Sequence, residues 1–497
     1  MAVSRVLAVC GLTVFALLPI AGLLTGVARA AAGESDGWIS LFDGKTLAGW
    51  EEGAGTKGTF RVAGGRIVAE GAVGVIAYVG DGRPLEFRNF EFRTDVLTKP
   101  GASFGVCVNS PVWGPHPVEV HVHNSAAPAR TLEDLLKTGT LVGFRGQLKP
   151  LVPDDRWFTL RAVVRGRRIE VYVDAVLVTD FMVPKDFGAT MGVRAGPTRR
   201  VELLNCRPGA QTWLKDLRLR RLADEPAATE PQPPVARPDA VGTEIRRLLA
   251  DKFPFADFHI HLKGGLTLDE ALAQSRRKGI FYGIAANCGL GFPIHDDRGA
   301  QEFLRQMAGQ PCFVGIQAEG REWPTLVSKE TLAKFDYVFT DAMTIVDHRG
   351  RRARLWIKEE VDIPDAQEFM ELLVRTIEDI LRHEPIDIYA NPTYLPAIIA
   401  ADYDRLWTPE RQRRVLRAAA ENGVAIEISN SLRLPKPEFI KAAKAAGIRF
   451  TLGTNNGDRE LGREEYGLEM IRTCGLTWQD MWMPKPEGQK PIQVKGR

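Results

Sequence analysis

The sequence predicts a protein of two domains, an antiparallel β-sandwich of the jelly-roll type followed by an α/β barrel. Three observations predict this fold class. Residues 38–222 carry short stretches in which apolar and polar residues alternate with period two, as in half-buried strands. Residues 244–497 alternate apolar stretches with helical patterns, which indicates a parallel sheet. Residues 223–243 are rich in proline and poor in large apolar residues, which is typical of a stiff, solvated linker.

The strands of the first domain are expected in a series of alternating stretches with no strong helical pattern between them. The stretches are GTFRVAGGRIVAEG, NFEFRTDVL, SFGVCVNS, VEVHVHN, FTLRAVVRGRRIEVYVDAVLVTDF and TWLKDLRLRRL. Two successive hairpins are predicted to turn at Gly166-Arg167 and at Asp174-Ala175. One short helix is expected within residues 131–139. Many short strands of this kind predict a sandwich or jelly roll.

The second domain is expected to contain seven strands with helices between them. The strands are predicted at residues 255–261, 280–287, 312–319, 337–343, 386–391, 425–429 and 449–454. Thr267 and Glu270 form a capping-box pattern at the start of one helix. Gly423 and Gly447 follow two others as stop signals. Seven strands in a domain of this length favour a closed (β/α) barrel over an open sheet.

Residues 1–30 have the pattern of a secretory signal peptide. Arg5 provides a basic start, an apolar run extends from Val6 to Leu24, and Ala28-Arg29-Ala30 is a cleavage pattern. We therefore expect a periplasmic or secreted protein without a stable membrane span after cleavage. The alternative is a retained membrane anchor, because the run is long for a cleaved segment.

The composition is that of an ordinary globular protein. The chain has 497 residues and a net charge of only +3, so nothing indicates a nucleic-acid partner. Beyond the N-terminal segment its five cysteines are scattered. Buried free thiols are therefore favoured over a Cys107–Cys206 bridge.

Each predicted strand of the second domain ends in a polar residue. These residues are His259 and His261, Asn287, Glu319, Asp341, Asn391, Glu427 with Ser429, and Asn455. The carboxyl ends of parallel barrel strands meet at one mouth, where barrel enzymes have their active sites. His259 and His261 lie two apart, so both side chains point the same way and can bind one cation. Glu319 and Asp341 are the candidates to complete a site for Zn²⁺, Mn²⁺ or Fe²⁺.

The second half resembles the PHP family (the polymerase and histidinol phosphatase superfamily), whose members have a seven-stranded (β/α) barrel. FADFHIHL resembles its opening His-x-His motif, FVGIQAEG its strand with a metal-binding Glu, and GIRFTLGTNNG its last strand. The chain has Asn287, Met343, Asn391, Asn455 and Gly457 at places where that family usually has His or Asp. The resemblance therefore implies a hydrolase reduced to a single metal, or a metal-free sugar or phosphate pocket in which Asn287, Asn391 and Asn455 bind substrate. No organic cofactor is implied.

The stretch VEVHVHN is the candidate site of the first domain. Glu119, His121 and His123 point to one side of a strand, and the three valines between them point to the other. A sandwich buries one face of each sheet, so the polar side chains are expected on the outer, concave face. A carboxylate beside imidazoles suits proton abstraction next to a ketone, or metal binding.

The first half resembles the 3-keto-disaccharide hydrolase family, which has a concanavalin-like jelly roll. The resemblance rests on GWISLFDGKTLAGW, on DDRWFTLRAVVRGRRIEVYVDAVLV and on the closing TWLKDLRLRRL. It implies cleavage of glycosidic bonds in 3-keto-sugars, with Glu119 as general base and His121 and His123 as ligands or proton carriers. Trp113 would then provide a stacking platform and Arg145 an oxyanion partner.

Two functions are therefore expected to compete. The first is an exported carbohydrate-active hydrolase or lyase that acts on a glycan or small-molecule substrate, with a metal-dependent barrel. The second is a non-enzymatic glycan-binding surface protein whose barrel is only a scaffold.

Overall fold

The structure is a computed structural model that describes residues 37–53, 58–80, 89–108, 118–126, 131–183, 201–223, 240–251 and 253–495. The chain divides into two units, Met1–Gly37 and Trp38–Arg497. The fold described below is that of the second unit. The expected signal peptide and most of the expected linker lie outside the described residues.

The first half forms two antiparallel sheets. An eight-stranded sheet has the order β11-β10-β9-β6-β13-β4-β3, with β1 also paired to β13. A five-stranded sheet has the order β2-β5-β12-β7-β8. The strands are β1 (Trp38–Ser40), β2 (Trp50–Glu52), β3 (Phe60–Ala63), β4 (Arg66–Ala69), β5 (Gly74–Tyr78), β6 (Phe90–Thr98), β7 (Phe104–Val108), β8 (Val118–Val122), β9 (Phe158–Arg165), β10 (Arg168–Val173), β11 (Val176–Met182), β12 (Val201–Asn205) and β13 (Thr212–Arg221).

One apolar core is shared by these two sheets, so the expected jelly-roll-like sandwich is confirmed. Phe92 and Leu160 of the large sheet and Val106 and Val120 of the small sheet belong to the same buried cluster. The two predicted hairpins turn where expected, since β9, β10 and β11 are separated only by residues 166–167 and 174–175. The expected short helix is α1 (Leu132–Leu135), which begins with a capping box between Thr131 and Asp134.

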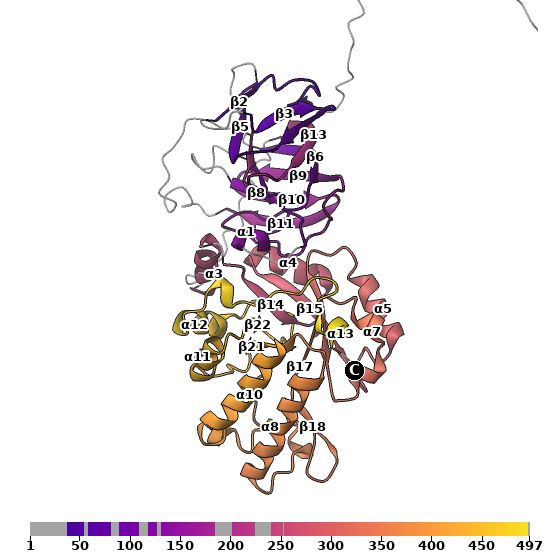
Figure 1. Cartoon of the computed structure of the whole chain (residues 1–497), viewed down its shortest axis with the longest axis vertical. Coiled ribbons are helices and arrows are strands. Elements are labelled where there is room, and N and C mark those ends of the chain that lie inside the picture. The colour runs from indigo at the N-terminus through magenta and orange to yellow at the C-terminus, as the bar shows by residue number, and fades with distance from the viewer. Residues whose placement is uncertain are drawn as a thin grey trace, which may run out of the picture. The chain divides into compact units, whose positions relative to one another are not determined.

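The second half is a closed barrel of seven parallel strands, as the sequence predicts. The strands are β14 (Ala256–Ile260), β15 (Phe281–Cys288), β16 (Phe313–Ala318), β17 (Tyr337–Thr340), β20 (Ile388–Tyr389), β21 (Ala425–Ser429) and β22 (Phe450–Gly453). Each strand falls within or next to its predicted stretch. A small antiparallel hairpin, β18 (Thr344–Val346) with β19 (Arg352–Arg354), extends the connection after β17. The strands and their helices can be followed in Figure 1.

Helices connect the barrel strands. They are α3 (Ala240–Ala250), α4 (Leu268–Lys278), α5 (Asp297–Gln306), α6 (Trp323–Leu326), α7 (Lys329–Leu332), α8 (Ala366–His383), α9 (Tyr403–Leu406), α10 (Pro409–Asn422), α11 (Pro437–Ala445), α12 (Glu465–Thr473) and α13 (Pro491–Val494), with 3₁₀ turns at Lys358–Glu360, Ala400–Asp402 and Trp478–Asp480. The predicted capping box of Thr267 and Glu270 begins α4. Gly423 ends α10 in the left-handed conformation, where a residue without Cβ avoids strain.

The barrel interior has two chemically different ends. Phe281, Phe313 and Tyr337 are the first residues of their strands, and they pack with Phe258 and Trp482 in one aromatic cluster. Phe258 lies 5.8 Å from Phe313 and 5.2 Å from Trp482 between ring centroids. This cluster fills the amino-terminal end of the barrel, so the polar side chains that follow the strands occupy the carboxyl end.

Cys107, Cys288, Cys312 and Cys474 are buried free thiols, in agreement with the sequence. Within the described ranges, no helix combines the length and apolar character needed to cross a bilayer.

Candidate functional site

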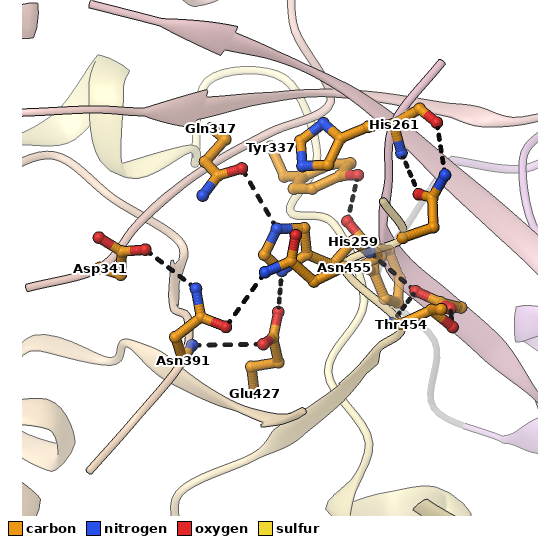
Figure 2. Close-up of polar contacts among 12 residues, drawn as sticks. His259, His261, Gln317, Tyr337, Asp341, Asn391, Glu427, Thr454 and Asn455 are labelled. Atoms are coloured by element: carbon orange, nitrogen blue, oxygen red, sulfur yellow. Dashed lines mark hydrogen bonds and ion pairs between the residues drawn. The ribbon is translucent and has the colours of Figure 1, made fainter. Parts of the chain in front are cut away.

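His259 is the centre of a buried hydrogen-bond network at the carboxyl end of the barrel (Figure 2). Its Nδ1 lies 2.6 Å from Glu427 Oε2, and its Nε2 lies 3.2 Å from Gln317 Oε1. Burial alone would lower the pKa of His259, but the Glu427 carboxylate outweighs burial and raises it. Both ring nitrogens of His259 are therefore held by protein oxygens.

His261 lies beside His259, with 5.1 Å between the ring centroids. Its Nδ1 donates to the Ala285 carbonyl at 2.9 Å. The His261 backbone N–H donates to Asn456 Oδ1, and Asn456 Nδ2 donates to the His261 carbonyl. Its Nε2 is buried and has no hydrogen-bond partner among the described residues. Burial, followed by the charges of His259 and Lys263, lowers the pKa of His261 well below its usual value. The ring is therefore neutral, with a lone pair on Nε2.

Asn287 connects the histidine pair to Glu319. Its Nδ2 donates to Gln317 Oε1 at 2.9 Å and to Glu319 Oε1 at 2.8 Å. The other oxygen of Glu319, Oε2, is buried without a hydrogen-bond partner in the described part of the chain. Burial, followed by the neighbouring Asp341 carboxylate, raises the pKa of Glu319 to about 8. Glu319 thus belongs to the same polar cluster as His259, through two intervening amides.

Asn391 connects Asp341 to the other side of the network. Its Nδ2 donates to Asp341 Oδ2 at 2.9 Å, and its backbone N–H donates to Glu427 Oε1 at 3.2 Å. Asn455 reaches Asn391 Oδ1 at 3.4 Å. Asn391 and Asn455 have φ angles of 45° and 46°, a left-handed conformation that Asn adopts more readily than most residues. The backbone at these two strand ends therefore favours asparagine independently of any ligand.

The expected metal ligands His259, His261, Glu319 and Asp341 thus come from one end of the barrel, but their donor atoms do not form a metal site. Within the described ranges no three His, Cys, Asp or Glu side chains are grouped to hold a metal ion. Both nitrogens of His259 face protein oxygens, and the amide hydrogens of Asn287 and Asn391 occupy one oxygen each of Glu319 and Asp341. Of the four expected ligands, as far as the described residues show, His261 Nε2 and Glu319 Oε2 are the atoms without partners, whereas catalytic zinc sites use three protein ligands. A resident divalent metal does not fit these residues.

The sandwich carries a second polar cluster on β8. Val118, Val120 and Val122 point into the shared core, so Glu119, His121 and His123 share the other face of the strand. The Glu119 side chain is 25% exposed, but that of His121 is only 4% exposed. Residues 138–142 run along β8, since Gly139 N–H donates to the His121 carbonyl and Val142 N–H to the Glu119 carbonyl. Both histidines are therefore more buried than an open face would leave them.

Glu119 and His121 form a bonded pair across a glycine. Glu119 Oε1 lies 3.2 Å from His121 Nδ1. Gly105 on β7 stands opposite His121, and a Cβ at that position would lie 2.9 Å from Glu119 Oε1. The missing side chain therefore gives the Glu119 carboxylate room to reach His121. His121 Nε2 has no hydrogen-bond partner among the residues described.

His123 lies one step along the strand, 6.3 Å from His121 between ring centroids. Its Nδ1 donates to the Ala102 carbonyl at 2.6 Å. Burial, followed by the charge of Lys137, lowers the pKa of His123 to about 4. Lys137 is itself buried, which lowers its pKa to about 8, and its Nζ donates to two backbone carbonyls. His123 is therefore uncharged at neutral pH.

The other two residues expected to act in the first domain are Trp113 and Arg145. Trp113 lies outside the described residues. Arg145 is buried, with Nη2 donating to Ser275 Oγ at 3.1 Å and its guanidinium 5.4 Å from the centre of the Phe281 ring. Its charged group thus contacts residues of the second half rather than Glu119.

Sequence reasoning missed Gln317 and Lys263 of the barrel cluster, and it named Glu427 at a strand end without giving it a role. Gln317 is a polar residue within the apolar strand FVGIQA, and Glu427 is the acidic residue of AIEIS. Lys263 is exposed and follows His261 by two residues, and its charge lowers the pKa of both His261 and Glu319. A polar residue inside an otherwise apolar strand was the available signal for Gln317 and for the role of Glu427.

Comparison with known proteins agrees with the resemblance expected for the first half. Residues 37–220 match a family model described as a 3-keto-alpha-glucoside-1,2-lyase-like domain. The sandwich half of the chain is therefore similar to the domain that this model describes. None of the curated proteins compared with the chain matches it.

Three solved structures similar to the chain each cover less than half of it. A candidate glycosyl hydrolase from Parabacteroides distasonis is 19% identical over 38% of this chain and 94% of its own, with a TM-score of 0.30. A carbohydrate-binding module from Bacillus subtilis is 14% identical over 35% of this chain and 95% of its own, with a TM-score of 0.22. Histidinol phosphate phosphatase from Lactococcus lactis, in complex with zinc, L-histidinol and phosphate, is 15% identical over 47% of this chain and 99% of its own, with a TM-score of 0.34.

Proposed function

We propose that the sandwich domain is a lyase that removes the C2 proton of a 3-keto-glycoside and expels the substituent at C1, with Glu119 as general base. The observation that carries the proposal is the partly exposed Glu119 carboxylate bonded to His121, within a domain that matches the 3-keto-alpha-glucoside-1,2-lyase-like family model.

The chemistry follows from the acidity of a hydrogen next to a ketone. Glu119 takes the C2 proton, and the electron pair of the broken C–H bond moves into an enolate with the C3 carbonyl. The enolate then forms the C1–C2 double bond as the C1–O bond breaks. The leaving oxygen takes up a proton and departs as an alcohol, so the products are an unsaturated keto-sugar and the free aglycone. A positioned general base contributes about 10²–10⁴-fold to such a step.

The neighbouring residues have supporting roles in this proposal. His121 Nδ1 holds the carboxylate of Glu119 in place, and His121 Nε2 is the nearby atom that can relay a proton. His123, uncharged and bonded to Ala102, supports the strand beside them. Trp113 remains the proposed stacking platform. Arg145 is not carried into the mechanism, because its guanidinium is already bonded to Ser275.

The test uses a p-nitrophenyl 3-keto-α-glucoside, from which elimination releases coloured p-nitrophenolate. We expect turnover by the wild-type chain and a loss of about 10²-fold or more in Glu119→Gln. Glu51→Gln is the matched control, because Glu51 is an exposed carboxylate of the same sheet, in β2. A substrate deuterated at C2 should slow the wild-type reaction.

One result would reject Glu119 as the base, and another would reject the lyase activity itself. Equal turnover by wild type and Glu119→Gln would remove Glu119 from the role of base. Binding of the keto-glycoside without any release of p-nitrophenolate would favour the competing function, a glycan-binding protein that does no chemistry.

We also propose that the chain is exported through residues 1–30. The support is the basic start, the apolar run and the Ala28-Arg29-Ala30 pattern in the sequence. Amino-terminal sequencing of the protein from a secreting host should begin at residue 31. A first residue of Met1 in the membrane fraction would indicate the retained anchor instead. Metal-dependent hydrolysis by the barrel is not proposed, because its donor atoms do not fit a metal.

A further inference from the structure

Among the described residues, several buried polar atoms at the carboxyl end of the barrel lack hydrogen-bond partners. They include His261 Nε2 and Glu319 Oε2, in residues that are 1% and 5% exposed, and also Ser429 Oγ. His261 follows β14 and Glu319 follows β16, and Asn287 of β15, the strand between them, bonds to Glu319. Burying a polar atom without a partner costs free energy, because its hydrogen bond to water is lost. Two such atoms in one cluster indicate a surface shaped for a ligand.

The surrounding bonds define what each atom can accept. His261 Nδ1 faces a backbone carbonyl, which only accepts, so Nδ1 carries the hydrogen and Nε2 is an acceptor. Glu319 Oε1 accepts from Asn287, which leaves Oε2 to accept a hydrogen bond, or to donate one if the carboxyl is protonated. A hydroxyl group satisfies both atoms, because it donates and accepts.

The same bonds disfavour a charged ligand. Among the predicted metal ligands in the described part of the chain, a cation would find His261 Nε2 and Glu319 Oε2 without other partners, since both nitrogens of His259 are occupied. A phosphate needs N–H donors, but both side-chain hydrogens of Asn287 bond to Gln317 and Glu319, and Asn391 Nδ2 already donates to Asp341. Glu319, Asp341 and Glu427 would also repel an anion, and the charges of His259, Lys263 and Arg321 offset this repulsion only in part.

We infer that the carboxyl end of the barrel is a metal-independent binding site for a neutral, polyhydroxylated ligand, whose hydroxyl groups bond to His261 Nε2 and Glu319 Oε2. Lys263, exposed two residues after His261 and close enough for its charge to affect Glu319, marks where this site meets solvent. The inference concerns the second domain and does not depend on the lyase proposed for the first.

The first arm of the test measures metal. The full chain is incubated with Zn²⁺ or Mn²⁺, desalted and analysed for metal content, with thermal unfolding measured before and after chelation. We expect far less than one metal per chain and no change in melting temperature on chelation. One tightly bound metal per chain that is lost in His261→Phe would overturn the inference.

The second arm measures binding of methyl α-D-glucopyranoside by calorimetry, with inorganic phosphate as the charged comparison. We expect binding of the glucoside but not of phosphate. The affinity should fall at least about tenfold in His261→Phe and in Glu319→Leu, since a lost hydrogen bond of about 1.4 kcal/mol is a factor of ten. Glu421→Gln, at an exposed position of α10, should bind as the wild type does.

Hydrogen exchange provides a readout that needs no variant. Addition of the glucoside should slow exchange in the segments that contain residues 259–263 and 317–321. Absence of glucoside binding, tighter binding of phosphate, or protection confined to the sandwich would each overturn the inference. A failure of the keto-glycoside assay alone would leave it standing.

Discussion

His259 Nδ1 lies 2.6 Å from Glu427 Oε2, although 168 positions separate the two residues along the chain. Both side chains are 2% exposed or less. They belong to β14 and β21, which are not neighbours in the barrel, because β22 lies between them. The pair therefore crosses a strand, and Gly453 of β22 makes the crossing possible. A Cβ on Gly453 would lie 2.5 Å from Glu427 Cδ and 2.9 Å from His259 Cβ.

Removing the acidic partner should destabilise the barrel strongly. Breaking one side of a buried ion pair costs about 3–5 kcal/mol, because the remaining charge is left without a partner. We expect Glu427→Gln to lower the melting temperature of the barrel, whereas Glu421→Gln, at an exposed position of α10, leaves it unchanged. Differential scanning calorimetry checks this, and equal melting of both variants would contradict a stabilising pair.

Filling the space that Gly453 leaves between Glu427 and His259 should also destabilise the barrel. Gly453→Ala places a methyl group against Glu427 and His259, and overpacking of this kind costs about 1–3 kcal/mol. Gly457→Ala is the matched control, because a Cβ there meets nothing within 4 Å. Chemical denaturation followed by tryptophan fluorescence should separate the two. Comparable stability of both variants would show that the strand moves to accommodate the methyl group.

In the sandwich a glycine also makes room for a side chain, since Gly105 of β7 leaves space for Glu119 of β8. Gly105→Ala should displace the carboxylate from His121 and lower turnover of the 3-keto-glycoside by up to about 10²-fold, as misplaced catalytic groups do. Gly146→Ala serves as control, since its nearest neighbour, Leu136 Cδ2, lies at an ordinary 3.5 Å. Steady-state kinetics and a melting curve distinguish misplacement from unfolding. Wild-type turnover by Gly105→Ala would refute a positioning role for this glycine.

Asp387 should make the stability of the barrel depend on pH. Its Oδ2 accepts from Val338 N–H at 3.0 Å, and burial raises its pKa to about 7. The folded state therefore binds the proton more tightly than the unfolded state, whose Asp pKa is about 3.9. The contribution of Asp387 to stability is thus greatest below pH ~4 and declines as the pH rises to ~7, by at most about 1.4 kcal/mol per pH unit.

The variant Asp387→Asn removes this dependence. The melting temperature of Asp387→Asn should rise relative to that of the wild type as the buffer changes from pH 5 to pH 7.5. Scanning fluorimetry at matched ionic strength measures the difference. A constant difference across this range would show that Asp387 does not titrate within it.

The thiols should be protected from alkylation in the folded protein. Burial raises the pKa of Cys288 and of Cys312 to about 12, and burial, followed by Glu119 and Glu202, raises that of Cys107. The thiolate is the reactive form, so these residues should stay unmodified by iodoacetamide at pH 8. Half-buried Cys206 should react first. Peptide mapping with and without urea provides the measurement, and rapid native labelling of Cys288 would contradict the burial described.

Much of the fold could be predicted because its signals are local. The alternation of VEVHVHN placed its valines in the core, and the capping box of Thr267 and Glu270 marked the start of α4. The barrel strands were found because each is a short apolar stretch between helical patterns. The burial of His121 and His123 was not predictable, because it depends on residues 138–142 returning alongside β8.

The sequence by itself determined the two chain segments, their strand and helix patterns, and the polar residues at the barrel mouth. Only the tertiary structure decided how those residues bond. Gln317 and Glu427 bond to the ring nitrogens of His259, and Asn287 bonds to Glu319. Gly453 gives Glu427 the space to reach His259 across β22, and Gly105 of β7 gives Glu119 the space to reach His121 on its own strand. The physical reason is that periodicity reports which face a side chain takes on its own strand. The hydrogen-bond partner of that side chain is set by other strands, up to 168 positions away, through the closure of the barrel.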